Sequence, residues 1–201
     1  FNEAIKRLGL RQPDGGLATS EDEALEVAKN LNFPLMIRPS FVLGGRAMRV
    51  LYSKDELREY FKEGISVSDS RPVLLDKFLE NAIEVDVDAV RDNNSCVIAG
   101  VMEHIERAGI HSGDSSCVLP PVSLSESVVE ELKESAIKLA DALGVVGLLN
   151  VQFAVTPKNE VFVIEANPRA SRTVPFVSKA TGKPWAKIAA KAMLGEKIKD
   201  K

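Results

Sequence analysis

Two apolar runs on either side of a polar break at Thr156–Glu160 constrain the fold of this chain more than any other feature. Each run has the composition of a strand and the break that of a turn, so the segment predicts a β-hairpin. Gln152 lies in the first strand, and Glu165 and Asn167 lie at the end of the second. Because alternate residues of a strand point to the same face, Glu165 and Asn167 can face one point, and Gln152 can join them from the neighbouring strand. One carboxylate and two amide oxygens form an all-oxygen set that suits Mg²⁺.

Two arginines follow these oxygen-bearing residues directly. Arg169 and Arg172 come shortly after Asn167, and a guanidinium binds anionic oxygens through two parallel hydrogen bonds. Metal ligands beside arginines indicate phosphoryl chemistry, in which Mg²⁺ takes its remaining ligands from phosphate and water. The residues alone leave a second interpretation open, which is a surface hairpin that ends in an ordinary polar turn.

Composition and charge indicate a globular chain without a charge-driven partner. Of the 201 residues, 45% are apolar and 27% are charged, which is enough apolar sequence for a core. The formal charge of −3 gives no electrostatic reason to expect a nucleic acid or a membrane as a partner. Cys96 and Cys117 lack metal-type spacing and suit a reducing compartment, so we expect a cytoplasmic protein. No run is apolar over the thickness of a bilayer, and the first residue, Phe1, indicates a piece of a longer protein.

The N-terminal part of the chain predicts a small α+β unit. Gly44 and Gly45 lie in a loop between two expected strands, and paired glycines let a backbone approach a phosphate closely. The pair fits neither a Walker loop nor a dinucleotide fingerprint, and a plain β-turn is an alternative interpretation. Residues 12–16 are expected to form a turn. Periodicity and capping signals predict helices at residues 1–10, 21–31 and 53–62, and strands at residues 35–38, 49–52 and 73–78.

The rest of the chain predicts a larger antiparallel unit. In the strand expected at residues 82–90, apolar residues alternate with Glu84, Asp86 and Asp88. We expect Asp86 and Asp88 to lie on a solvated face, and Glu84 to lie where a linker between the units begins. A polar loop at residues 104–116 contains both histidines of the chain. A return strand is expected at residues 96–105, and helices at residues 125–143, 175–180 and 184–194.

These features, in this order, resemble the ATP-grasp family. They are Arg38, the Gly44–Gly45 loop, the Lys77–Glu84 crossover, the loop at residues 109–112, Gln152, and the segment Glu165–Arg169. The family has an α+β fold in which two subdomains with antiparallel sheets close over ATP. The resemblance implies a lead-in helix and turn at residues 1–18, a small subdomain with the glycine-rich hairpin at residues 19–80, and a large subdomain with the metal site at residues 81–201.

Longer motifs narrow the resemblance to the large subunit of carbamoyl-phosphate synthetase. They are IRPSFVLGGRAM, MEHIERAGIHSGDS, NVQFAV and IEANPRASRTVPFVSKATG. Three of these segments are similar to the second, C-terminal synthetase half, which implies that this half phosphorylates carbamate with ATP in arginine and pyrimidine biosynthesis. The partners implied are ATP, carbamate (or bicarbonate and ammonia), the remaining domains of the large subunit, and a glutamine amidotransferase small subunit.

The resemblance also implies a role for each matching residue. Arg38 would pair with nucleotide phosphate, under the loop of Gly44 and Gly45. The adenine and ribose pocket would contain Lys77, Leu79, Glu84, Gly109, Ile110, His111 and Ser112. The metal ligands would be Gln152, Glu165 and Asn167. Of these, Gln152 and Glu165 would also contact the nucleotide. They would hold Mg²⁺ or Mn²⁺, as two ions, with K⁺ as a further cation. Carbamate and the transferred phosphoryl group would be stabilised by Arg169 and Arg172.

Three other functions remain open from the sequence. The first is the other synthetase half, which activates bicarbonate. The second is a different ATP-grasp ligase, such as a biotin carboxylase or a purine-pathway carboxylate–amine ligase, although these should lack RTVPFVSKATG and HSGDS. The third is a non-catalytic nucleotide-binding module, against which the complete set of metal-type side chains and arginines argues.

Overall fold

The computed structural model describes residues 2–39, 48–63, 72–110 and 115–198. The chain forms two compact units, one made of Phe1–Gln12 and Asn81–Lys201 and the other of Pro13–Glu80. Each unit packs helices against an antiparallel sheet, which confirms the expected α+β class. Within the described ranges, none of the helices has the length and hydropathy needed to cross a bilayer.

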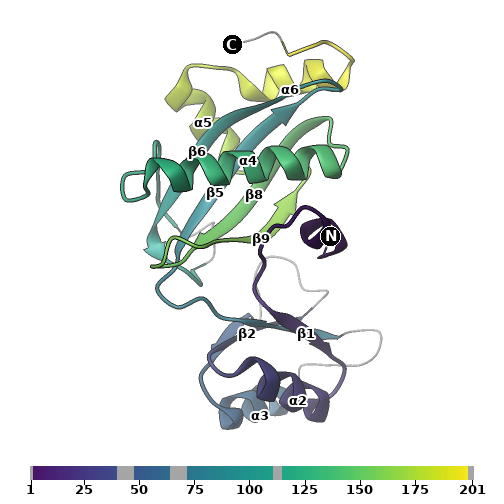
Figure 1. Ribbon diagram of the computed structural model, residues 1–201, viewed down its shortest axis with the longest axis vertical. Helices are drawn as coiled ribbons and strands as arrows, with labels where there is room; N and C mark the ends of the chain where they lie inside the picture. Colours follow the sequence, from purple (N-terminus) through teal and green to yellow (C-terminus); the bar gives the residue numbers. More distant parts are fainter. Residues whose placement is uncertain (1, 40–47, 64–71, 111–114, 199–201) are drawn as a thin grey trace. The chain divides into compact units, whose positions relative to one another are not determined.

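The smaller unit has its two described helices on one face of its sheet (Figure 1). Its described strands pair antiparallel in the order β1-β4-β2-β3. Leu35 and Ile37 of the sheet pack with Leu57 and Tyr60 of the second helix in a single buried core. In chain order the elements are β1 (Gly15–Ala18), α2 (Glu21–Leu31), β2 (Leu35–Pro39), β3 (Arg49–Leu51), α3 (Lys54–Lys62) and β4 (Val73–Lys77).

Capping boxes begin both of these helices. The backbone N–H of Glu23 donates to Ser20 Oγ at 3.2 Å, and the Glu23 carboxylate accepts from the backbone N–H of Thr19 at 2.8 Å. Ser53 and Glu56 repeat the arrangement at the start of α3. These reciprocal bonds satisfy N–H groups that have no partner inside a helix, so α2 and α3 begin where the sequence predicts.

The turn predicted at residues 12–16 is wrong at its C-terminal end, because β1 begins at Gly15 and pairs with β4. A side-chain carbon at Gly15 would collide with the carboxylate of Asp76, and one at Gly16 would lie 2.8 Å from Cγ1 of Val27. These two glycines therefore permit close packing rather than chain reversal.

The larger unit is built on a sheet whose described strands pair in the order β7-β6-β5-β8-β9, all antiparallel. Helix α4 crosses one face (Figure 1), where Leu132 and Leu139 pack on Val87 and Phe153. Helices α5 and α6 pack against the sheet in a separate core. The elements are α1 (Asn2–Arg7), β5 (Ile83–Arg91), β6 (Cys96–Arg107), β7 (Cys117–Val118), α4 (Glu126–Ala142), β8 (Gly147–Val155), β9 (Val161–Asn167), α5 (Val174–Thr181) and α6 (Trp185–Met193).

The sheet of the larger unit also contains buried acidic side chains. Asp86 is 2% exposed and Asp88 1%, so the prediction that they lie on a solvated face is wrong. Asn150 of β8 donates its amide to Asp86 Oδ1 at 3.0 Å and to Asp88 Oδ1 at 2.9 Å. The alternation of β5 separates its polar from its apolar residues correctly. It does not reveal that later segments of the chain cover the polar side.

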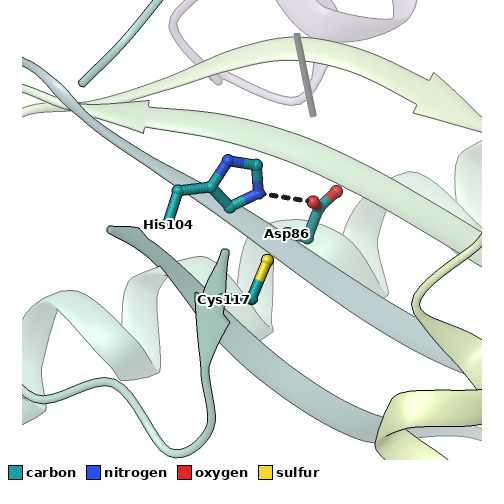
Figure 2. Close-up of side chains that lie close together, drawn as sticks. All are labelled: Asp86, His104 and Cys117. Atoms are coloured by element: carbon teal, nitrogen blue, oxygen red, sulfur yellow. Dashed lines mark hydrogen bonds and ion pairs between the residues drawn. The ribbon is translucent and has the colours of Figure 1, made fainter. Parts of the chain in front are cut away.

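A histidine and a thiol lie next to Asp86. Figure 2 shows His104, Asp86 and Cys117 side by side, with His104 Nε2 2.7 Å from Asp86 Oδ2. One ligand atom from each lies within 4.8 Å of the others, which is close enough to consider a metal. However, both Asp86 oxygens already accept hydrogen bonds, and burial raises the pKa of the Cys117 thiol to about 11. The trio is therefore explained as a buried, hydrogen-bonded Asp86–His104 pair beside a protonated thiol.

Asp86 favours the charged form of His104. Burial lowers the pKa of His104, but the hydrogen bond and charge of Asp86, helped by the charges of Glu84 and Glu106, outweigh burial and raise the pKa above its ordinary value. We predict that Asp86→Asn lowers the pKa of His104, because burial then acts without the carboxylate. Titration of the imidazole by NMR measures this shift, and a His111→Asn background leaves His104 as the one histidine of the chain.

The same pKa shift predicts how stability depends on pH. A pKa that is raised in the folded state gives stability that is fully present below the unfolded value, about 6.5, and is lost as the pH rises through the folded value. The difference in unfolding free energy between the parent chain and His104→Asn should therefore be larger at pH 6 than at pH 9. Urea unfolding at the two pH values measures it, and an unchanged difference would contradict the assignment.

Candidate functional site

Strand β8 lies between β5 and β9, and its pairing aligns polar residues across three strands. Directly paired residues in an antiparallel sheet point to the same face. One row consists of Asp86, Gln152 and Glu165, and the next of Asp88, Asn150 and Asn167. Every position in both rows bears a side-chain oxygen, so the sheet presents a continuous oxygen-rich patch.

The three predicted metal ligands lie together in this patch. Gln152 pairs with Glu165 across the hairpin, and Asn167 Nδ2 donates to Glu165 Oε1 at 2.7 Å. All three side chains are half-buried. That bond does not use Asn167 Oδ1 or Glu165 Oε2, and Gln152 adds its own amide oxygen. A hard divalent cation prefers such a set of oxygens, so these residues fit Mg²⁺ or Mn²⁺.

Two residues predicted for the nucleotide pocket also contact each other. The backbone N–H of Gly109 donates to Glu84 Oε1 at 2.9 Å. Burial raises the pKa of the Glu84 carboxyl, and the charges of Asp86 and Glu165 add to the rise, whereas Gly109 and His104 oppose it. Glu84 is two residues from Asp86 in β5 and so lies on the same face of the sheet as the row of Asp86, Gln152 and Glu165. A raised pKa of this kind is typical of functional sites.

The arginines lie on the segment that follows β9. We call residues 168–173 the arginine turn. Its first bend is tight, because the backbone N–H of Arg169 donates to the carbonyl of Asn167 at 2.8 Å. Both Arg169 and Arg172 are exposed. The hairpin therefore presents two guanidinium groups on the segment that directly follows the oxygen-bearing residues.

The smaller unit has its own charged group among the predicted residues. Arg38 of β2 forms an ion pair with Asp76 of β4 at 2.8 Å, and its buried Nε has no hydrogen-bond partner among the described residues. Burial raises the pKa of Asp76, while Arg38 opposes that rise. Lys77 Nζ donates to the carbonyls of Asn32 and Phe33, both at 3.1 Å. Within the described part of the chain, this N–H therefore has no acceptor, and an anionic oxygen could accept a hydrogen bond from it.

For two predicted residues the structure gives a position but no contact that bears on their predicted role, and four others lie outside the described residues. Leu79 is half-buried in the smaller unit, and Ile110 is exposed in the larger one. Gly44, Gly45, His111 and Ser112 lie outside the described residues. Their roles stay predictions.

Sequence reasoning missed several residues next to the site. Asp88 and Asn150 belong to its second row, and His104 connects Asp86 with Glu84. Asn150 precedes Gln152 by two positions in one strand, so the alternation used for Glu165 and Asn167 would also have included it. Asp88 gave no comparable signal, because a solvated carboxylate and a buried one look the same in a single sequence.

Solved structures with the same fold include ATP-grasp carboxylases and ligases. A biotin carboxylase from Campylobacter jejuni, in a complex with β,γ-ATP, matches with a TM-score of 0.83 over 98% of this chain and 46% of that one, at 20% identity. An N5-carboxyaminoimidazole synthase from Aspergillus clavatus, bound to ADP and its ribonucleotide, matches with a TM-score of 0.80 over 98% and 51%, at 18% identity. Similarity at this identity shows the fold alone, and it confirms the ATP-grasp architecture.

Sequence relatives are much more similar. The chain is 58% identical over its whole length to the carbamoyl phosphate synthase large chain, C-terminal section, of Aquifex aeolicus, and covers 37% of it. It is 56% identical to the carbamoyl phosphate synthase large chain of Vibrio cholerae, of which it covers 18%. Residues 1–201 match the family described as the carbamoyl-phosphate synthase L chain, ATP binding domain. The chain therefore belongs to this family of ATP-binding domains of carbamoyl-phosphate synthase large chains.

Proposed function

We propose that this chain is the part of a carbamoyl-phosphate synthase large chain that phosphorylates carbamate with ATP. The observation that carries the proposal is the patch in which Gln152, Glu165 and Asn167 meet directly before the arginine turn. The assignment to carbamate rather than bicarbonate is supported by two relatives, 58% and 54% identical, that are described as C-terminal sections of the large chain. These sections match the half to which the sequence motifs are similar.

In this proposal the protein positions its substrates and neutralises charge. Gln152, Glu165 and Asn167 hold Mg²⁺ or Mn²⁺, which supplies compensation for the charge of the triphosphate. Glu84 and the Gly109 backbone orient the nucleoside, and Arg38 binds phosphate. Carbamate is already an anion, so its oxygen needs no general base to attack the γ-phosphorus. A new O–P bond forms as the bond from phosphorus to the ADP oxygen breaks.

In this proposal the two arginines act on the phosphoryl acceptor, carbamate, and on the transferred phosphoryl group. Arg169 and Arg172 bind the anionic oxygens of carbamate and of the phosphoryl group, and so bring together two species that repel each other. Acyl phosphates and carbamate decompose in water, so the remaining domains of the large chain are proposed to enclose the reaction. A glutamine amidotransferase subunit is proposed as the source of ammonia.

The metal ligands can be tested by binding alone. We predict that Gln152→Ala and Glu165→Gln each weaken the binding of Mn²⁺ with ATP to this chain by about tenfold or more, because each removes an oxygen ligand or its charge. Electron paramagnetic resonance of Mn²⁺ measures the bound fraction. Glu160→Gln is the matched control, since it changes a carboxylate at the opposite end of the same strand pair, and it should bind as the parent does.

The reaction itself can be isolated by running it backwards. Carbamoyl phosphate and MgADP give ATP and carbamate only at the half that phosphorylates carbamate. In the full-length large chain, Glu165→Gln should slow this ATP formation on the order of 100-fold or more, as the loss of charge stabilisation does at other electrostatic sites. Bicarbonate-dependent ATP hydrolysis should persist.

The opposite pattern would assign this chain to the other half. If Glu165→Gln abolishes bicarbonate-dependent ATP hydrolysis and spares ATP formation from carbamoyl phosphate, this chain activates bicarbonate. If Glu165→Gln and Glu160→Gln both leave the two reactions unchanged, the metal assignment is wrong.

A further inference from the structure

A buried carboxylate of the central sheet contacts the segment that bears the arginines. Thr173 Oγ1 donates to Asp88 Oδ2 at 2.6 Å, and Ser171 Oγ lies 2.9 and 3.1 Å from the two Asp88 oxygens. The two hydroxyls are themselves 2.7 Å apart. Both belong to the arginine turn, and Asp88 lies more than eighty residues earlier, in β5. This is therefore a tertiary attachment, not a local turn contact.

Thr173 does not use its hydroxyl in the ordinary way for its position. It is the N-cap residue of α5, where a threonine oxygen usually accepts from the first backbone N–H groups of the helix. Here the side chain makes no capping bond, and it donates to Asp88 instead. The start of α5 is fixed through Asp88 and through Val174, which packs in the core below the helix.

The carboxylate is itself held in place. Asn150 donates to Asp88 and to Asp86, and Asp86 pairs with His104. We call Asp86, Asp88, His104, Asn150, Ser171 and Thr173 the polar network. Replacing buried ionic groups with apolar ones is often neutral or stabilising, so a network of this kind is a weak source of stability. It does specify one geometry, because each oxygen of Asp88 has its donors at defined positions.

We propose that Asp88 is a positioning residue, which through Ser171 and Thr173 fixes the arginine turn so that Arg169 and Arg172 reach the transferred group. The inference rests on the proposed role of these arginines in phosphoryl transfer. A small displacement of a binding group from its productive position can lower a rate as much as losing the group. The hydroxyls therefore act on catalysis without touching the substrate.

The test uses three threonine variants in the full-length large chain. Thr173→Val removes the hydroxyl and keeps the shape of the side chain, whereas Thr173→Ser keeps the hydroxyl. Thr181→Val is the matched control, because the Thr181 hydroxyl, at the end of α5, also makes two hydrogen bonds, one to the carbonyl of Val177 and one from Trp185 of α6, and neither involves Asp88. The readout is ATP formation from carbamoyl phosphate and MgADP, followed by luminescence so that low rates are measurable.

Thr173→Val should lower kcat/KM for carbamoyl phosphate on the order of ten- to a hundredfold. The KM for MgADP should stay unchanged, since the nucleotide contacts are on other segments. Thr173→Ser should recover most of the loss, and Thr181→Val should show none. A Thr173→Val protein with the activity of the parent overturns the proposal. Should Thr173→Val fail to fold, Ser171→Ala removes the neighbouring hydroxyl and takes its place.

A double-mutant cycle with Arg169→Ala separates positioning from general damage. If the hydroxyl acts through the arginine, Thr173→Val should cause little further loss in the Arg169→Ala protein. An equal loss with and without Arg169 means that the hydroxyl acts elsewhere and overturns the proposal. The test does not depend on whether this chain phosphorylates carbamate or bicarbonate. If the Glu165→Gln result assigns bicarbonate activation to this chain, the same cycle is measured on bicarbonate-dependent ATP hydrolysis.

Discussion

The antiparallel register of β8 with its two neighbours is the constraint on which the candidate site depends. It places Gln152 opposite both Asp86 and Glu165, and Asn150 opposite both Asp88 and Asn167. A shift of one residue would turn Gln152 toward α4 and Val151 toward the polar patch. The apolar alternation of β8 prevents such a shift, because Val151 and Phe153 fill the core under α4. The packing of one face therefore determines the chemistry of the other.

The polar face contains more charge than a core alone would require. Asp86 and Asp88 are buried, and Glu84 is close to them. Burying an isolated charge is unfavourable in free energy. Hydrogen bonds from Asn150, from His104 and from the two hydroxyls of the arginine turn offset this unfavourable term. A cation bound by Gln152, Glu165 and Asn167 would add positive charge where the carboxylates concentrate negative charge.

Some parts of this molecule could be predicted from local sequence because their physics is local. The capping boxes at Ser20 and Ser53 involve residues three or four apart, and the hairpin of β8 and β9 closes over a short turn. The glycines at residues 15 and 16 misled the prediction, since glycine serves both turns and close packing. Whether the Asp88 side chain contacts water or Thr173 depends on the arginine turn, which lies far along the chain. A local sequence pattern therefore does not predict it.

The sequence by itself determined the family, the α+β class and the grouping of Gln152, Glu165 and Asn167. Long motifs identify relatives, and a period of two places residues on one face of a strand. Only the tertiary structure decided that Asp86 and Asp88 are buried, that the backbone of Gly109 donates to Glu84, and that Asp88 accepts hydrogen bonds from the arginine turn. These facts depend on which distant segments meet, and contacts of that kind follow from the packing of the whole unit rather than from the order of neighbouring residues.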